Sequence, residues 1–177
     1  ITNEENDEFD DLNCFVKILI NSIDKEDIPN THVLLKILSP GGVAYKFEHT
    51  YLSLMRLKEK GFKITALIDE IAASGGYMLA SACDKIVASK YATIGSVGVI
   101  AQVYNWAELG KKVGIEEKTF TTGSHKNIFP SGSAYNETDV ERMNESLKDV
   151  FDVFKDIVQK SRNLNENQLE EVLKAKT

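Results

Sequence analysis

The chain has 177 residues, 42% of them hydrophobic and 27% charged, so it is long enough to bury a substantial core. Its 27 acidic and 21 basic residues give a formal net charge of −6, which argues against a nucleic-acid partner because phosphate binding needs a basic surface. Two cysteines cannot build a disulfide framework, and no cysteine or histidine cluster has zinc-ligand spacing. No apolar run approaches the roughly 18 residues of a membrane span.

The N-terminal half is predicted to alternate helices with short buried strands. Apolar residues recur every three or four positions over 9–23 and 45–60, which indicates amphipathic helices. A short apolar run over 33–38 and the stretch over 63–68 indicate buried strands, and the small residues of 75–82 indicate a further helix. This alternation predicts an α/β fold with a mainly parallel sheet and flanking helices.

The C-terminal half is predicted to continue the sheet and then to become helical. We expect strands over 85–88, 96–100 and 117–121, a turn around 93–95, and helices over 106–113, 136–158 and 166–175. The apolar stripe of the long helix has two interpretations of equal weight, packing against its own sheet or forming an oligomer interface. No linker composition interrupts the chain, so we expect a single domain over residues 1–177.

Glycine-marked turns follow three of the predicted strands, over 39–42, 73–76 and 93–96. The carboxyl ends of parallel strands share one edge of a sheet, where functional sites assemble. The middle turn places Ser74 between a strand and a helix, with small neighbours that expose its hydroxyl and with backbone amides at a helix N-terminus. That arrangement suits a nucleophile. Taken alone, a serine here is more often a helix cap.

A serine nucleophile needs a general base, and the sequence restricts the choice. His32 precedes the first strand and His49 falls within a helix, so neither is naturally presented to the shared edge. The loop over 122–127 follows a predicted strand and offers both His125 and Lys126. A lysine acts as a base only where desolvation or nearby charge lowers its pKa.

Five ordered blocks resemble the signal peptide peptidase A and SohB group of serine proteases, which share the ClpP/crotonase fold. The resemblance covers residues 33–173. The blocks are Ile-Leu-Ser-Pro-Gly-Gly-Val (37–43), Ala-Ala-Ser-Gly-Gly-Tyr-Met (72–78), Asp-Lys-Ile-Val-Ala (84–88), Ile-Gly-Ser-Val-Gly-Val (94–99) and Gly-Ser-His-Lys-Asn (123–127). A ClpP/crotonase-like α/β fold with a helical C-terminal extension is therefore expected.

The resemblance implies a Ser/Lys dyad that hydrolyses peptide bonds through an acyl-enzyme. Ser74 matches the nucleophile, Lys126 the general base, and Ser96 the serine that hydrogen-bonds the lysine. The backbone amides of Gly42 and Gly75 match the oxyanion hole, with Gly41 as a possible substitute for Gly42. No metal or nucleotide cofactor is implied.

The resemblance also implies partners and a location. The substrate is expected to be a hydrophobic or signal peptide, bound as an extended strand along 94–99 and 120–123. Family members form homo-oligomers and are anchored by an N-terminal membrane segment, with the catalytic domain outside the bilayer. We therefore expect this chain to be a soluble catalytic piece of a longer, membrane-associated protein.

Three alternatives remain open. A crotonase-type acyl-CoA enzyme would use the same oxyanion site and could draw on the carboxylates of Asp69 and Glu70. A non-catalytic, peptide-binding scaffold could retain the fold without turnover. A Ser/His/Asp triad could use His125 in place of Lys126.

Overall fold

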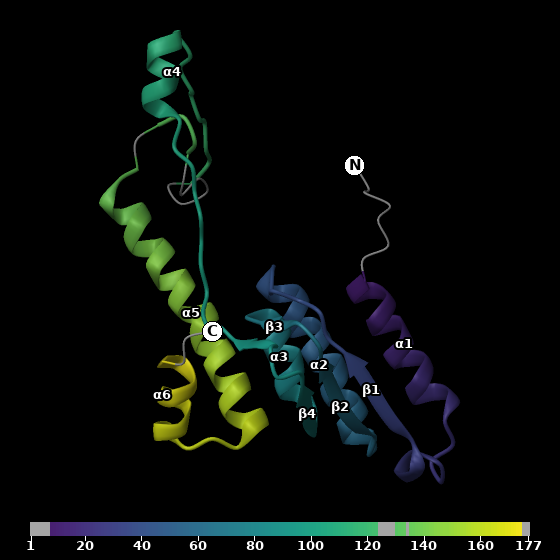
Figure 1. Ribbon diagram of the computed structural model, residues 1–177. Coiled ribbons are helices and arrows are strands. Elements are labelled where there is room, and N and C mark those ends of the chain that lie inside the picture. The colour runs from purple at the N-terminus through teal and green to yellow at the C-terminus, as the bar shows by residue number, and fades with distance from the viewer. Residues whose placement is uncertain (1–7, 124–129, 134, 175–177) are drawn as a thin grey trace. The chain divides into compact units, whose positions relative to one another are not determined.

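The computed structural model describes residues 8–123, 130–133 and 135–174. The chain divides into two compact units, the first formed by Ile1–Gly98 with Val153–Thr177 and the second by Val99–Asp152. Figure 1 shows their helices and strands. The expectation of one domain over residues 1–177 stays a prediction.

The first unit is built around two small parallel sheets. Strands β1 (His32–Lys36), β2 (Lys63–Ile68) and β4 (Lys85–Ala88) form one sheet in the order β1-β2-β4. Strands β3 (Ile71–Ala73) and β5 (Thr93–Gly95) form the other. The central strand β2 is an almost continuous apolar run because neighbours cover both of its faces. The predicted mixed α/β fold with parallel sheets and flanking helices is confirmed.

Helices α1 (Glu8–Ser22), α2 (Ala44–Lys60) and α3 (Gly75–Ala82) belong to this unit, as does α6 (Glu166–Lys174). In Figure 1, α1 and α2 lie side by side. A short 3-10 helix, Ile28–Asn30, leads into β1. Helix α2 ends at Lys60, as the predicted range over 45–60 does, and the φ of 102° at Gly61 lets its N–H bond back to the carbonyls of Leu57 and Lys58.

The core of the first unit lies between the sheet and its helices. Its most deeply buried side chains come from α2, from β2 and the residue before it, from α3, and from the C-terminal end of α5 (Glu137–Arg162). They include Leu54, Leu57, Phe62, Ile64, Ile68 and Val158. The C-terminal end of the predicted apolar stripe on α5 therefore packs in the chain's own core, whereas Val140 at its other end is 46% exposed.

The second unit contains helix α4 (Ala107–Val113) and the first part of α5, joined by segments without regular secondary structure. The prediction of a strand over 117–121 is wrong. A strand is stabilised by pairing with a neighbour, and this segment has none among the described residues. Phe120 is accordingly 93% exposed.

The prediction of a strand over 96–100, preceded by a turn over 93–95, is also wrong. Residues 93–95 are themselves the strand, because they pair with β3 in the register Ala72↔Ile94 and Ala73↔Gly95. Ser96 has a φ of 52°, which turns the chain out of the ladder after Gly95. The apolar residues that follow lack a neighbouring strand in the described part of the chain, and Ile100 is 90% exposed.

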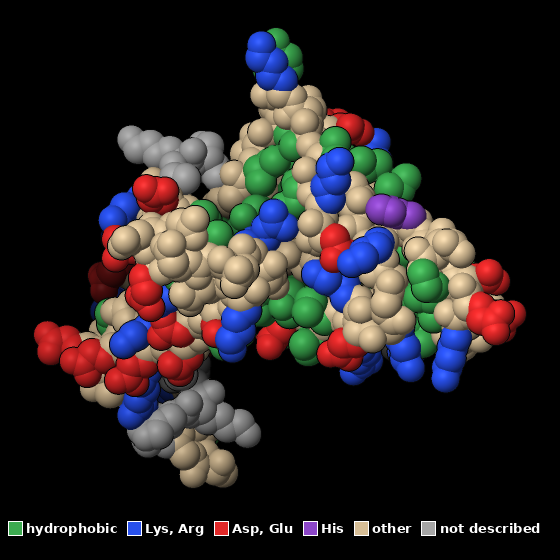
Figure 2. Space-filling view, turned by 90° about the horizontal axis from the view of Figure 1, so that it is seen from below, with side chains coloured by type: hydrophobic (Ala, Val, Ile, Leu, Met, Phe, Trp, Pro, Cys, Tyr) green, Lys and Arg blue, Asp and Glu red, His purple; other side chains and the backbone are tan. Residues whose placement is uncertain are grey.

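No helix within the described ranges has the length and apolar character needed to cross a membrane. The face shown in Figure 2 carries Lys and Arg side chains interspersed with Asp and Glu side chains, and hydrophobic side chains lie between them. Charges of both signs are mixed over this face, which agrees with a modest net charge of −6.

Candidate active site

Ser74 lies on a sharp turn between β3 and α3, in the first unit. Its backbone has φ 51° and ψ −120°, a conformation that costs a non-glycine residue free energy and persists only where its surroundings impose it. Two backbone hydrogen bonds hold it, from Ser74 N–H to the Gly95 carbonyl (2.8 Å) and from Met78 N–H to the Ser74 carbonyl (3.0 Å). A strained serine between a strand and a helix is the geometry of a nucleophile elbow.

The Ser74 side chain is not a helix cap. Although Ser74 occupies the N-cap position of α3, its hydroxyl makes no capping hydrogen bond. The residue is partly exposed, whereas Ala73 and Gly75 on either side are buried. The hydroxyl is thus left available for chemistry, and the capping interpretation that the sequence left open is set aside.

Three glycines at this turn and at the turn over 39–42 lie so close to their neighbours that side chains would not fit. A Cβ on Gly41, which has a φ of 102°, would lie 2.6 Å from Ser74 Cβ and 3.0 Å from its Oγ. A Cβ on Gly76 would lie 2.6 Å from the Ser39 carbonyl oxygen, and one on Gly75 would overlap the ring of Phe47. The structure therefore brings the turn over 39–42 directly against the Ser74 turn.

Main-chain hydrogen bonds fix the two turns together. Ser39 N–H donates to the Ile71 carbonyl and Ala73 N–H donates to the Ser39 carbonyl, both at 2.9 Å, so Ser39 extends the edge of β3. Sequence reasoning assigned no role to Ser39, although it lies within the Ser-Pro-Gly-Gly motif. Its hydroxyl also accepts a hydrogen bond from Gly41 N–H at 3.2 Å.

The backbone amides expected to form an oxyanion hole differ in whether they already donate a hydrogen bond within the protein. Gly41 N–H is already bonded to Ser39 Oγ, which favours Gly42 over Gly41 as a donor to a ligand. Within the described residues, neither Gly42 N–H nor Gly75 N–H has a hydrogen-bond partner. Gly75 begins α3, where backbone N–H groups have no acceptor inside the helix. Two unengaged donors beside a serine hydroxyl can stabilise a developing oxyanion.

Ser96 follows directly after β5, beside the Ser74 turn. The paired register ends at Ala73 and Gly95, and Ser74 N–H donates to the Gly95 carbonyl at 2.8 Å, so Ser96 lies one residue beyond the bond that holds Ser74. Both serines have positive φ, at 51° and 52°, and Ser96 is exposed. Lys126 and His125 lie outside the described residues, so the choice of general base stays a prediction.

The other two histidines have partners within the fold. His32 Nε2 lies 2.8 Å from Thr65 Oγ1, at the start of β1 and β2, and His49 Nδ1 lies 3.1 Å from Asn13 Nδ2, between α2 and α1. Both belong to local packing contacts between elements. This placement agrees with the sequence-based expectation that neither serves the site.

The carboxylates near the turn face solvent. Asp69 forms an exposed ion pair with Lys36 at 2.7 Å, and the hydrogen bond and charge of Asp69 raise the pKa of Lys36. On α3, burial raises the pKa of the Tyr77 phenol above its ordinary value. Among the described residues, no group of three or more His, Cys, Asp or Glu side chains could hold a metal ion.

Comparison with known proteins gives consistent matches. The model of Peptidase family S49 matches residues 56–177. A probable protease SohB of Haemophilus influenzae is 35% identical over 147 residues, which cover 83% of this chain and 40% of that relative. A probable protease SohB of Buchnera aphidicola is 34% identical over 137 residues, 76% of this chain and 41% of the relative.

A third relative carries a different name. A putative signal peptide peptidase SppA of Enterococcus faecium is 30% identical over 148 residues, which cover 84% of this chain and 43% of the relative. The chain thus spans about two fifths of the length of these curated relatives.

Proposed function

Because this chain belongs to peptidase family S49, we propose that it carries the nucleophile and the oxyanion site of a serine peptidase. Ser74 is the nucleophile, Gly42 and Gly75 donate the oxyanion hydrogen bonds, and Lys126 is the general base. The observation that carries the proposal is the strained, uncapped Ser74 beside two unengaged amides. We propose this activity for the whole protein as well as for this chain.

The proposed reaction is acyl transfer. The neutral amine of Lys126 accepts the proton of Ser74 Oγ as this oxygen attacks a peptide carbonyl carbon. The carbonyl oxygen takes up the negative charge and accepts hydrogen bonds from Gly42 N–H and Gly75 N–H. The C–N bond then breaks, the leaving amine receives the proton, and water hydrolyses the resulting ester on Ser74.

Ser96 is proposed to orient the lysine amine toward Ser74. Its support is the hydrogen bond from Ser74 N–H to the Gly95 carbonyl (2.8 Å), which brings Ser96, the residue after Gly95, beside the Ser74 turn. A hydroxyl that accepts a hydrogen bond from the amine would fix its direction, and an apolar environment around the amine would lower its pKa.

The substrate is proposed to be a hydrophobic or signal peptide that binds as an extended strand along 94–99 and 120–123. Parts of these segments have unpaired backbone among the described residues, as strand addition requires. Self-association is proposed through the second unit, whose exposed Ile100, Trp106 and Phe120 provide apolar surface. We also propose that the whole protein is membrane-associated.

Hydrolysis of an apolar peptide ester tests the chemistry. We expect Ser74→Ala and Lys126→Ala each to lower kcat by at least about 10³-fold, because each removes a member of one catalytic unit. Ser89→Ala and Lys118→Ala, at exposed positions outside the site, serve as matched controls with unchanged rates. Sedimentation of each variant shows whether the assembly is preserved.

Labelling with a fluorophosphonate gives a second readout. We expect wild type to be labelled at Ser74 and Ser74→Ala to remain unlabelled. Undiminished hydrolysis by Ser74→Ala would show that Ser74 is not the nucleophile. Loss of activity in His125→Ala, together with retained activity in Lys126→Ala, would show that His125 and not Lys126 is the general base.

A further inference from the structure

The ring of Phe47 lies against both glycines of the proposed oxyanion site. Phe47 is on the first turn of α2 and is 3% exposed. A Cβ on Gly75 would overlap Cγ and Cδ2 of the ring, and a Cβ on Gly42 would lie 3.3 Å from its Cε2. One side of the ring therefore faces the start of α3, while its far edge reaches the turn before α2.

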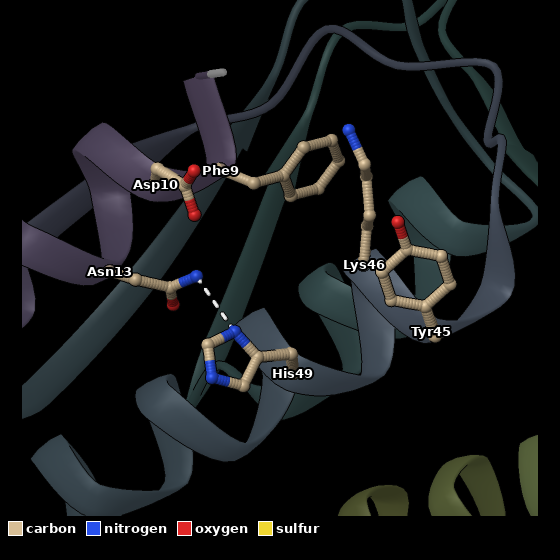
Figure 3. A pocket seen from close by; sticks show the side chains of 6 residues that line it. All are labelled: Phe9, Asp10, Asn13, Tyr45, Lys46 and His49. Atoms are coloured by element: carbon tan, nitrogen blue, oxygen red, sulfur yellow. Dashed lines mark hydrogen bonds between the residues drawn. The ribbon is translucent and has the colours of Figure 1, made fainter. Parts of the chain in front are cut away.

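A second aromatic side chain backs this ring. Phe9 of α1 meets Phe47 with ring centroids 4.8 Å apart and an interplanar angle of 81°, an edge-to-face contact that favours a fixed orientation. Figure 3 shows Phe9, Asp10 and Asn13 of α1 facing Tyr45, Lys46 and His49 of α2 around a pocket of about 270 Å³.

Helix α1 is held in this place by a polar contact as well as by packing. The buried Asn13 side chain lies 3.1 Å from His49 Nδ1 and donates to Thr50 Oγ1 at 3.3 Å. These contacts fix one turn of α1 on α2, next to the pair of aromatic rings. Contacts with α1 therefore restrain the Phe47 ring in addition to its contacts with the glycines.

The two proposed oxyanion donors belong to different elements. Main-chain hydrogen bonds fix the two turns together at Ser39, and beyond that point the separation of the donors depends on packing. Gly42 precedes α2 and Gly75 begins α3, and no described hydrogen bond joins their amides. Close-packed protein interiors transmit displacement because they contain little free volume. A rigid ring in contact with both glycines therefore acts as a spacer between the two elements.

We propose that Phe47 is a positioning residue that sets the separation of Gly42 N–H and Gly75 N–H, and that Phe9 holds its ring in place. This inference rests on the proposed function for its catalytic consequence. Phe47 acts through the backbone of the two glycines.

The substitution Phe47→Leu, with Phe62→Leu as its matched control, tests the spacer. Leucine retains branched carbons near Gly75 but loses the ring edge that reaches Gly42. Phe62 is 1% exposed in the same core, and the described contacts of both glycines do not include it. We expect Phe47→Leu to lower kcat about 10- to 100-fold with little change in KM, because a donor displaced by a fraction of an ångström stabilises the transition state less well.

The control should lose stability with little loss of kcat. Thermal unfolding of both variants shows that the comparison is made between folded proteins. Unchanged kcat in Phe47→Leu, or an equal fall in both variants, would overturn the proposal.

A double-mutant cycle that combines Gly75→Ala with Phe47→Ala distinguishes the spacer role from a general loss of stability. The new methyl group collides with the Phe47 ring, so we expect Gly75→Ala alone to lower kcat by about 10²-fold or more. In Gly75→Ala combined with Phe47→Ala the methyl group enters the vacated space. We expect the double variant to regain at least about 10-fold over Gly75→Ala. Losses that simply add would contradict the spacer role.

Crystal structures separate this inference from the proposed function. If wild type neither hydrolyses the ester nor labels at Ser74, the proposed function fails, and the distance between Gly42 N and Gly75 N still decides the positioning role. We expect this distance to change in Phe47→Leu and not in Phe62→Leu. If the distance between Gly42 N and Gly75 N is the same in Phe47→Leu and Phe62→Leu, the positioning role of Phe47 is refuted.

Discussion

The two units use similar apolar residues in opposite ways. In the first unit these residues fill a core between parallel strands and helices, with Leu54, Ile64 and Val158 at most 1% exposed. In the second unit, Ala107 is the one buried hydrophobic residue among those described, and Ile100 and Phe120 are at least 90% exposed. Apolar content alone therefore does not produce a strand or a core; a neighbouring element has to cover it.

The largest expected difference between the units comes from truncating a leucine in each. Leu54→Ala removes a side chain that is 1% exposed and should lower the free energy of unfolding by about 2–5 kcal/mol, because a cavity remains. Leu109→Ala removes one that is 54% exposed and should change it by about 0.5 kcal/mol or less. Urea denaturation measures both. Equal effects would show that the second unit buries Leu109 in solution.

A pair of glycines gives the next largest contrast. Gly41→Ala combines a φ of 102° with a methyl group 2.6 Å from Ser74 Cβ, whereas Gly114→Ala has a φ of 77° and open space around it. We expect Gly114→Ala to cost about 1–2 kcal/mol from backbone strain alone, and Gly41→Ala to cost more and to slow fluorophosphonate labelling of Ser74. Urea denaturation and labelling rates measure the two effects. A Gly41→Ala variant with wild-type labelling would show that the contact with Ser74 relaxes freely.

A third expected effect is a pH dependence that originates in the first unit. Burial raises the pKa of the Cys83 thiol to about 12 from an ordinary value of 9.0. The unfolded thiol loses its proton as the pH rises above 9, but the folded thiol keeps it, so the Cys83 contribution to stability falls between about pH 9 and 12.

Comparison of two cysteine variants isolates this contribution. Cys83→Ala should make the unfolding free energy less dependent on pH in that window than it is in wild type. Cys14→Ala, at an exposed thiol, should leave the dependence unchanged. Equal slopes for wild type and Cys83→Ala in urea denaturation at several pH values would contradict the prediction.

Helices and strands of the first unit can be predicted from the sequence where the local hydrophobic pattern agrees with the packing of distant parts of the chain. The period of α2 places Tyr51, Leu54 and Leu57 on the face that is buried, and Gly61 ends the helix as its sequence position indicates. The strand over 63–68 has the bounds that its sequence predicts, because it is central and four of its six residues are apolar. The failures at 96–100 and 117–121 have one cause: an apolar run does not reveal whether another strand lies beside it.

The features of the candidate site likewise divide into those that the sequence indicates and those that only the structure reveals. Ser74 could be singled out from its position between a strand and a helix, whereas the roles of Gly42, Gly75 and Ser96 came from the resemblance to the protease family. The structure places these residues at adjoining turns and strand ends. The backbone angles of Ser74 could not be predicted from the sequence, because the surrounding ladder imposes them. Phe47 could not be identified either, because along the helix it has the same pattern as any other core residue.

The bonds that join the Ser39 and Ser74 turns are all made by peptide groups. Every amino acid except proline carries the same N–H and C=O groups, so this framework does not depend on side-chain identity at the positions it passes through. The glycines are different, because there the absence of a side chain is the requirement. Sequences descended from a common ancestor can therefore diverge widely along these strands and still hold the serine in one conformation, while their glycines stay fixed.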